Sequence, residues 1–163
     1  MFIADEITLE TGFPAVRTQL AKLAGNGLIV AISRAAYSEG GQELLRAGRV
    51  RGLPGTLRLA EVRLGELVLV DDRARLPLHW EAMGAGGKRC PVLDADITLA
   101  GALAETAVLA LAGAYWPPPS LAVTGLDQAA IRRCAACTTR AFLARLGCAV
   151  VHPAGQARPA HDR

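Results

Sequence analysis

Four ionisable side chains would support general acid–base chemistry if the fold brought them into one enclosed site: His79, Glu81, Asp94 and Asp96. Imidazole and carboxylate groups are the usual carriers of protons in active sites. The four residues belong to two segments in which polar and apolar residues alternate, separated by a glycine-rich turn. This pattern predicts an antiparallel hairpin with His79 across from Asp94 or Asp96.

The role of these four groups depends on which face of the hairpin they occupy. On an enclosed face they could act in catalysis, and on a solvated face they would form a charge ladder, a row of charged side chains paired across neighbouring strands. Leu78 and Trp80 alternate with His79 and Glu81, so they point to the opposite face. If Trp80 is buried, the charged residues lie on the solvated side, where cross-strand pairs contribute about 0.2–1 kcal/mol each. A catalytic arrangement would need a one-residue register slip that exposes Trp80. We therefore expect a charge ladder.

A second group, Cys134, Cys137, Cys148 and His152, has the composition of a zinc site with three thiolates and one imidazole. However, apolar residues at helical spacing predict one long helix over 126–150. Cys137 and Cys148 would lie roughly 16 Å apart along its axis, too far to share one ion. The three cysteines are predicted to be small core residues on one stripe of the helix. We expect no metal ion and no cofactor.

The elements that must position these residues follow an α+β order. Residues 2–9 alternate loosely and predict a first strand, which two helices follow. The first is capped by Thr11 and ends at Gly25-Asn26-Gly27, and the second ends at Gly40-Gly41. Apolar residues then recur at every second position, which predicts a meander of strands over 57–64 (with a bulge near 60–61), 67–70, 73–82, 92–100 and 106–115.

A sheet with one apolar face must bury that face against another element, and the final helix can pack against it. The prediction is one domain over residues 1–150, in which a curved antiparallel sheet of about six or seven strands wraps around the C-terminal helix. Two short helices follow the first strand, and residues 151–163 form a disordered tail. The 31 alanines and seven aromatic residues make small interior side chains frequent, which favours unfilled space between sheet and helix.

The composition excludes several classes of protein. The net charge is +3 with no run of like charges, so we expect no binding of nucleic acid. The N-terminal residues lack the basic-then-apolar order of a signal peptide, and Glu105 interrupts the most apolar stretch, 99–116. We expect a cytoplasmic protein without membrane insertion. The sequence leaves the oligomeric state open, a homodimer included.

Four segments carry a resemblance to a known family: Leu78-His-Trp-Glu-Ala82, Pro91-Val-Leu-Asp-Ala-Asp-Ile97, Gly113-Ala-Tyr-Trp-Pro-Pro118 and Thr138-Thr-Arg-Ala-Phe142. With the order of elements, they resemble uncharacterised bacterial members of the START-like superfamily, the SRPBCC or polyketide cyclase/dehydrase group. The resemblance covers residues 1–150 and implies the helix-grip fold, with a hydrophobic cavity between the sheet and the long helix. It implies a lipid- or polyketide-like ligand, and in a minority of members cyclisation or dehydration. It transfers no catalytic residue.

The side chains expected to line this cavity face inward from the strands and from the long helix: Leu78, Trp80, Ile97, Leu109, Leu111, Tyr115, Ile131, Thr138 and Phe142. Trp80 and Tyr115 are singled out because each carries a polar atom that needs a partner when buried. The leading hypothesis is non-catalytic binding of a small hydrophobic molecule. Two alternatives stay open. One is a cyclase- or dehydratase-type enzyme in which Tyr115 or Thr138 orients a carbonyl, and the other is a structural or regulatory interaction module with a filled core.

Overall fold

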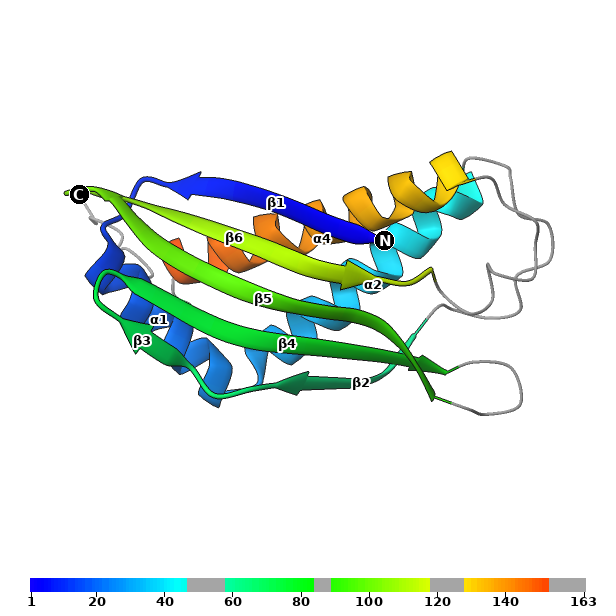
Figure 1. The fold of residues 1–163 in the computed structure, drawn as a ribbon, viewed down its shortest axis with the longest axis horizontal. Coiled ribbons are helices and arrows are strands. Elements are labelled where there is room, and N and C mark those ends of the chain that lie inside the picture. Colours follow the sequence, from blue (N-terminus) through cyan, green and yellow to red (C-terminus); the bar gives the residue numbers. More distant parts are fainter. Residues whose placement is uncertain (47–57, 84–88, 118–127, 153–163) are drawn as a thin grey trace, which may run out of the picture.

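The computed structural model describes residues 1–46, 58–83, 89–117 and 128–152, which form an α+β fold (Figure 1). The elements in chain order are β1 (Phe2–Leu9), α1 (Phe13–Gly25), α2 (Leu28–Arg46), β2 (Leu59–Leu64), β3 (Val68–Val70), β4 (Arg73–Met83), β5 (Arg89–Leu103), β6 (Thr106–Tyr115) and α4 (Gln128–Val151). Six described strands form one antiparallel sheet in the order β1-β6-β5-β4-β2, with β3 also paired to β4. The predicted fold class is confirmed. The predicted tail, 151–163, lies almost wholly outside the described residues.

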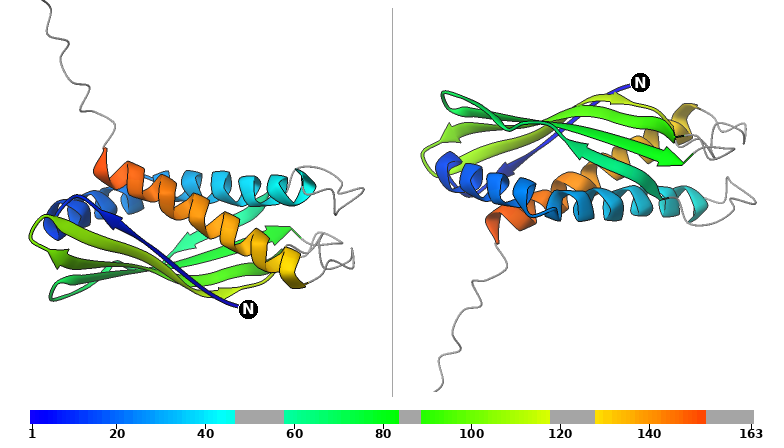
Figure 2. Two further views of the ribbon diagram at one scale, coloured as in Figure 1. Left: turned by 90° about the horizontal axis from the view of Figure 1, so that it is seen from above. Right: turned by 90° about the horizontal axis from the view of Figure 1, so that it is seen from below.

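The three described helices, α1, α2 and α4, lie on one face of the twisted sheet, and no described helix covers the opposite face (Figure 2). The C-terminal helix α4 crosses the inner face of the sheet beside α2. Both helices therefore cover this face, whereas the sequence predicted that α4 alone would cover it. By length and composition α4 could also cross a membrane, but half of its most apolar window is buried inside the protein. That burial is typical of a core helix.

The second helix is longer than the sequence predicts, because it continues through Gly40 and Gly41 to Arg46. A glycine inside a helix costs only about 1 kcal/mol relative to alanine, so it does not have to end one. Gly40 is also required for packing, since a Cβ there would lie 1.8 Å from Thr138 Oγ1 of α4. The predicted end at Gly40-Gly41, and the description of this helix as short, are therefore wrong.

The first helix begins one residue later than predicted. Its N-cap is Gly12 rather than Thr11, and no side chain caps it. A Cβ at Gly12 would lie 2.8 Å from the carbonyl oxygen of Ala104, so a close backbone approach determines the residue there. The predicted end is confirmed, because α1 stops at Gly25 and Gly27 takes a left-handed conformation with φ of 78°.

The predicted hairpin register is confirmed. His79 pairs with Asp94 across β4 and β5, and Trp80 pairs with Leu93. Along β4 the inward positions are buried and the outward ones are not, as the alternating pattern requires. The predicted bulge in the second strand is present between Leu59 and Glu61. This register directs Trp80 towards the helices and His79 towards solvent.

Candidate functional site

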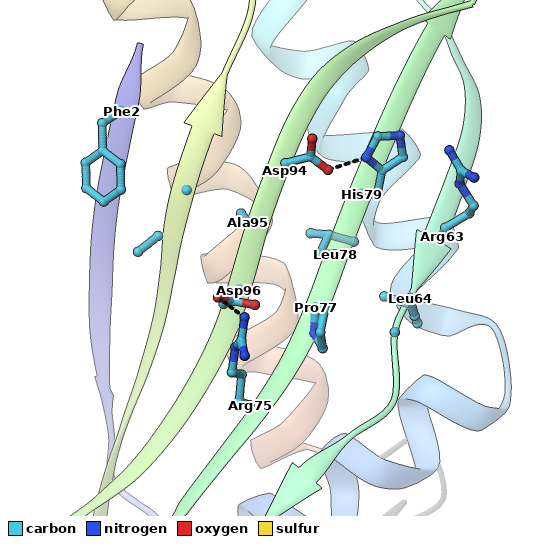
Figure 3. A pocket seen from close by; sticks show the side chains of 13 residues that line it. Phe2, Arg63, Leu64, Arg75, Pro77, Leu78, His79, Asp94, Ala95 and Asp96 are labelled. Carbon is cyan, nitrogen blue, oxygen red and sulfur yellow. Dashed lines mark hydrogen bonds and ion pairs between the residues drawn. The ribbon is translucent and has the colours of Figure 1, made fainter.

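The four acid–base candidates lie on the outer face of the sheet. Figure 3 shows three of them, His79, Asp94 and Asp96, on the side away from the helices. His79 Nδ1 hydrogen-bonds to Asp94 Oδ1, and His79 Nε2 lies 3.1 Å from Glu81 Oε1. Asp96 pairs instead with Arg75, at 2.9 Å. The predicted charge ladder is therefore present, and the four groups do not converge in an enclosed site.

The environment of His79 favours the charged imidazolium. Partial burial acts to lower the pKa of His79, but hydrogen bonds to Asp94 and Glu81 outweigh it, and the pKa is raised. Both ring nitrogens are engaged by carboxylates, so neither is available to take a proton from a substrate. The open depression beside this ladder, about 830 Å³ in volume, is lined by Phe2 and Pro77 as well as by charged residues. We interpret it as a solvated surface.

A different group of polar side chains meets inside the fold. It comprises Tyr37 from α2, Trp80 from β4, Tyr115 from β6, and Cys134 and Thr138 from α4, and we call it the interior polar cluster. Each of the five side chains is at most 2% exposed. These four elements are far apart in the sequence, so only the tertiary fold brings the residues together.

The sheet and the aromatic rings set the geometry of the interior polar cluster. Trp80 pairs with Leu93, which in turn pairs with Tyr115, so the three residues form one row across the sheet. The Trp80 ring makes edge-to-face contacts with Tyr37 and Phe142, at centroid distances of 6.4 and 5.5 Å. Trp80 is thus held against both covering helices.

Two polar atoms of the cluster have partners. The Tyr115 hydroxyl lies 3.8 Å from Cys134 Sγ, and the Cys134 thiol donates to the carbonyl oxygen of Gly40 at 3.6 Å. The thiol proton is used in the second contact, so the tyrosine hydroxyl is the donor in the first. This chain links β6 to both helices.

Two other polar atoms of the cluster, Trp80 Nε1 and Thr138 Oγ1, are buried without any hydrogen-bond partner among the described residues. Other buried hydroxyls are satisfied: Ser33 donates to the carbonyl of Ile29 at 2.8 Å, and Thr139 donates to that of Ala135 at 3.0 Å. A buried polar group without a partner is uncommon and loses about 1–3 kcal/mol. The interior polar cluster therefore contains two buried polar atoms that lack a hydrogen-bond partner among the described residues.

The ionisable members of the cluster are neutral. Burial raises the pKa of Tyr37, Tyr115 and Cys134, and the Cys134 thiol raises the pKa of both tyrosines further. The Thr138 hydroxyl lies near enough to lower the pKa of Tyr115 and Cys134 somewhat, although it does not reach hydrogen-bond geometry. Among the side chains whose exposure the structure describes, which leaves out 41 and 43–46 of α2, no Asp, Glu, His, Lys or Arg is buried. The cluster can donate hydrogen bonds but offers no described base.

The nine residues predicted to line a cavity are nearly all in the interior. Ile131 is half-buried, because α4 turns Ala130 and Cys134 inward instead. The remaining eight are buried: Leu78, Trp80, Ile97, Leu109, Leu111, Tyr115, Thr138 and Phe142. The prediction treated Cys134 as core filling only. Its spacing of four residues from Thr138 on one helical face was the signal that links it to the cluster.

The cysteine stripe is only partly as predicted. Cys134 is buried, Cys137 is half-buried and Cys148 is exposed, so a core role for Cys148 is wrong. Towards its C-terminus α4 turns Gly147 to the sheet, where a Cβ would lie 2.5 Å from Ile7 Cδ1, and this leaves Cys148 outside. In the described ranges, no three His, Cys, Asp or Glu side chains are grouped closely enough to hold a metal ion.

Two further pockets lie along the flanks of α4. One, of about 730 Å³, lies between β1 and α4 and includes Arg132 and Arg140. The other, of about 710 Å³, lies between α2 and α4 and includes Cys148. Neither contains a member of the interior polar cluster.

No family model and no curated protein matches the chain. Among solved structures, the chain is similar to the crystal structure of the Zhui aromatase/cyclase from Streptomyces sp. R1128. The sequence identity is 12%, the match covers 95% of this chain and 98% of that chain, and the TM-score is 0.34. A similarity at this level assigns neither a family nor an activity, so function must follow from the interior polar cluster.

Proposed function

We propose that this protein binds a small, mostly apolar molecule between the sheet and helices α2 and α4. The observation that carries the proposal is the pair of buried atoms without partners, Trp80 Nε1 and Thr138 Oγ1. A ligand that brings a polar group to them restores hydrogen bonds that the described protein lacks, while its apolar part gains from burial. An apolar site with a few orienting polar groups is the usual form of a small-molecule site.

Two features support this proposal. The order of strands and helices, and the four quoted segments, resemble the START-like superfamily, which implies hydrophobic ligands. The buried face of the first half of α4 carries small residues, Ala130, Cys134, Ala135 and Thr138. The pockets described above lie outside this interior, so the proposal rests on the unsatisfied atoms rather than on an open cavity.

Tryptophan fluorescence can test the proposal, because the chain has two tryptophans, of which Trp80 is fully buried and Trp116 is 40% exposed. In Trp116→Phe, all tryptophan emission comes from Trp80. We expect the uncharged probe N-phenyl-1-naphthylamine to bind saturably and to quench that emission. In the matched variant Trp80→Phe, quenching of Trp116 should be much weaker. If no saturable binding occurs, or if Trp116 is quenched as strongly as Trp80, the proposed site is wrong.

An enzyme of the cyclase or dehydratase type is the second candidate, favoured by the convergence of Tyr37, Tyr115 and Cys134. A neutral tyrosine hydroxyl is a suitable donor to a developing oxyanion. Cyclisation and dehydration also need a general base, and the described interior supplies none. We therefore rank the enzyme below simple ligand binding. With a poly-β-ketone thioester as substrate, turnover that Tyr115→Phe removes while probe binding persists would favour the enzyme over simple binding.

An interaction module is favoured by a different observation. Three consecutive apolar residues, Val68–Val70, form β3 with 46–60% of each side chain exposed. Exposed apolar patches commonly mark contact surfaces. Light scattering over a range of concentrations distinguishes this candidate: association that Leu69→Lys removes would support it, and a monomer at every concentration would count against self-association.

A further inference from the structure

The strand β1 leaves one edge of the sheet open to a further strand. It is the last strand in the described order β1-β6-β5-β4-β2 (Figure 1). Its eight residues pair with β6 in an unbroken register, and none of them is a lysine or a proline. Natural proteins usually protect an exposed edge by shortening it, by a bulge, or by lysine and proline, because an edge strand can pair with another chain. The opposite edge has such protection, since β2 is bulged and β3 has only three residues.

The backbone groups that point out of this edge belong to alternate residues of β1. Met1 and Tyr115 of β6 exchange two hydrogen bonds of 2.7 Å each. In an antiparallel ladder, such bonded pairs alternate with pairs that do not bond to each other. Along this register, four residues of β1 direct their N–H and C=O groups away from β6: Phe2, Ala4, Glu6 and Thr8. These groups are the template for another strand.

The charges beside this edge are complementary to each other. β1 carries Asp5 and Glu6 and no basic side chain, whereas α4 carries four arginines and no acidic one. The hollow of about 730 Å³ between β1 and α4 is lined by residues 1–5 of β1 and by Arg132 and Arg140 of α4. Arg140 lies 3.9 Å from Asp5 Oδ2, while no acidic side chain in the described ranges pairs with Arg132. One chain therefore presents an acidic strand and a basic flank side by side, and two copies can satisfy each other.

We propose that the partner at this edge is β1 of a second copy of the chain, paired antiparallel about a two-fold axis. Two-fold pairing places one residue of β1 opposite the same residue of the other copy. A centre at Asp5 or Glu6 would set like charges directly opposite each other, which is destabilising. A centre at Ala4 avoids this and pairs Phe2 with Glu6 of the partner subunit. The open backbone groups of residues 2–6 then bond across the interface.

The opposite charges meet in this register. Odd-numbered side chains of β1 face α4, so the partner's Asp5 stands opposite Ile3, beside the hollow that Arg132 lines. Within one chain the Asp5 carboxylate accepts a hydrogen bond from the N–H of Glu6, at 3.0 Å. In the dimer that N–H donates instead to the carbonyl oxygen of Phe2 of the partner subunit. Each Asp5 is then released to pair with an arginine.

An exposed aromatic ring is also covered in this arrangement. The Phe2 side chain is 76% exposed and stands on the outer face of the sheet (Figure 3). In the proposed register it lies diagonal to Ala4 of the partner subunit, a separation that an aromatic ring can bridge. The interface does not involve the interior polar cluster, so this inference is independent of the ligand-binding function.

Sedimentation velocity over a wide range of protein concentrations tests the proposal. We expect a concentration-dependent dimer. Arg132→Glu should weaken this dimer about tenfold, because the contact occurs twice and the new carboxylate repels the partner's Asp5. Arg133→Glu is the matched control, since Arg133 is also exposed on α4 and the charge change is the same, but Arg133 does not line the hollow. The control should change the dissociation constant by less than about twofold.

A proline in β1 tests the backbone bonds directly. Ala4→Pro removes an N–H that β6 does not use, so circular dichroism should show a folded chain while the dimer dissociates. Thr8→Pro lies on the same edge beyond residues 2–6 and should leave the dimer intact. Amide hydrogen exchange gives a readout without variants. The N–H groups of Phe2 and Ala4 should exchange more slowly in the dimer than after dilution, and that of Thr8 should exchange equally in both.

Four results would overturn the proposal. One is a monomer at every concentration, even where an added acidic peptide binds this edge. Another is equal weakening of the dimer by Arg132→Glu and Arg133→Glu. A dimer that Leu69→Lys dissociates and Ala4→Pro leaves intact would place the interface at β3 instead. Exchange of the Phe2 and Ala4 amides that dilution does not change would exclude pairing through β1.

Discussion

Gly40 of α2 and Thr138 of α4 are in such close contact that a Cβ on Gly40 would lie 1.8 Å from Thr138 Oγ1. One turn earlier on α4, the Cys134 thiol donates to the carbonyl oxygen of the same glycine at 3.6 Å. The helix crossing at Gly40 therefore holds two members of the interior polar cluster in place. Gly40 was predicted to end α2, but its lack of a side chain is what allows α2 and α4 to pack closely.

The substitution Gly40→Ala should destabilise the protein, which is the opposite of its usual effect in a helix. Alanine gains about 1 kcal/mol over glycine from helix propensity, but forcing a methyl group into the Thr138 contact costs about 1–3 kcal/mol and displaces the helix. Gly25→Ala at the end of α1 is the matched control, because nothing lies within 4 Å of its Cβ position. Urea denaturation should show a net loss for the first variant and none for the second. Equal stabilisation of both would contradict the close crossing.

Thr138→Val and Thr139→Val should change stability in opposite ways, although they are adjacent buried threonines. The hydroxyl of Thr138 has no hydrogen-bond partner in the part of the chain that the structure describes, so replacing it by a methyl group of similar size should be neutral or stabilising by up to about 1 kcal/mol. The hydroxyl of Thr139 bonds to the carbonyls of Ala135 and Ala136, and its loss should cost about 1 kcal/mol. Thermal and urea unfolding of the two variants measure the difference. A clear loss of stability in Thr138→Val would mean that its hydroxyl is satisfied.

The sheet could be predicted from the sequence because its determinants are local. Alternation of apolar and polar residues sets the inward face of each strand, and a one-residue slip would have exposed Trp80. The hairpin alone places His79 across from Asp94 or Asp96, and the structure pairs it with Asp94. The strand over Thr106–Tyr115 likewise has the predicted bounds, because Trp116 and the prolines after it end the alternation.

The interior polar cluster could be predicted only in part, because it depends on contacts between distant elements. Trp80, Tyr115 and Thr138 could each be identified as inward-facing from its own element. The rotation of α4 that buries Cys134 and exposes Cys148 depends on Gly147 packing against β1. The role of Gly40 depends on the path of α2, and no local pattern specifies that path.

His79 should titrate above its ordinary pKa of 6.5 and should stabilise the fold at low pH. Partial burial acts to lower the pKa of His79, but the hydrogen bonds that its ring donates to Asp94 and Glu81 raise that pKa in the folded state. Because the folded state holds the proton more tightly, the stabilisation is fully present below about pH 6.5 and is lost as the pH rises through the folded pKa. The histidine resonances in NMR spectra measure this pKa, and His79→Gln identifies the signal among the three histidines.

Two aspartate variants test the cause of the raised pKa of His79, one as the test and the other as its matched control. Asp94→Asn removes a carboxylate that hydrogen-bonds to His79 and should lower its pKa. Asp96→Asn removes a carboxylate on the same face of β5 that pairs with Arg75 instead, and it should have a much smaller effect. If His79 titrates at or below 6.5, or if the two variants have equal effects, the charge ladder does not control this residue.

The two tyrosines of the chain, Tyr37 and Tyr115, should resist ionisation for as long as the protein is folded. Burial raises the pKa of both above the ordinary value of 10.0, and the Cys134 thiol raises both further. Below about pH 10 both states keep these protons, so the two groups do not change the unfolding free energy with pH. Above that pH only the unfolded chain releases them, and stability should fall by about 1.4 kcal/mol per pH unit for each tyrosine. Ultraviolet absorbance of tyrosinate should therefore appear together with the loss of circular dichroism, in one cooperative step. Tyrosinate that forms near pH 10 while the helical signal is intact would show that the interior polar cluster is open to water.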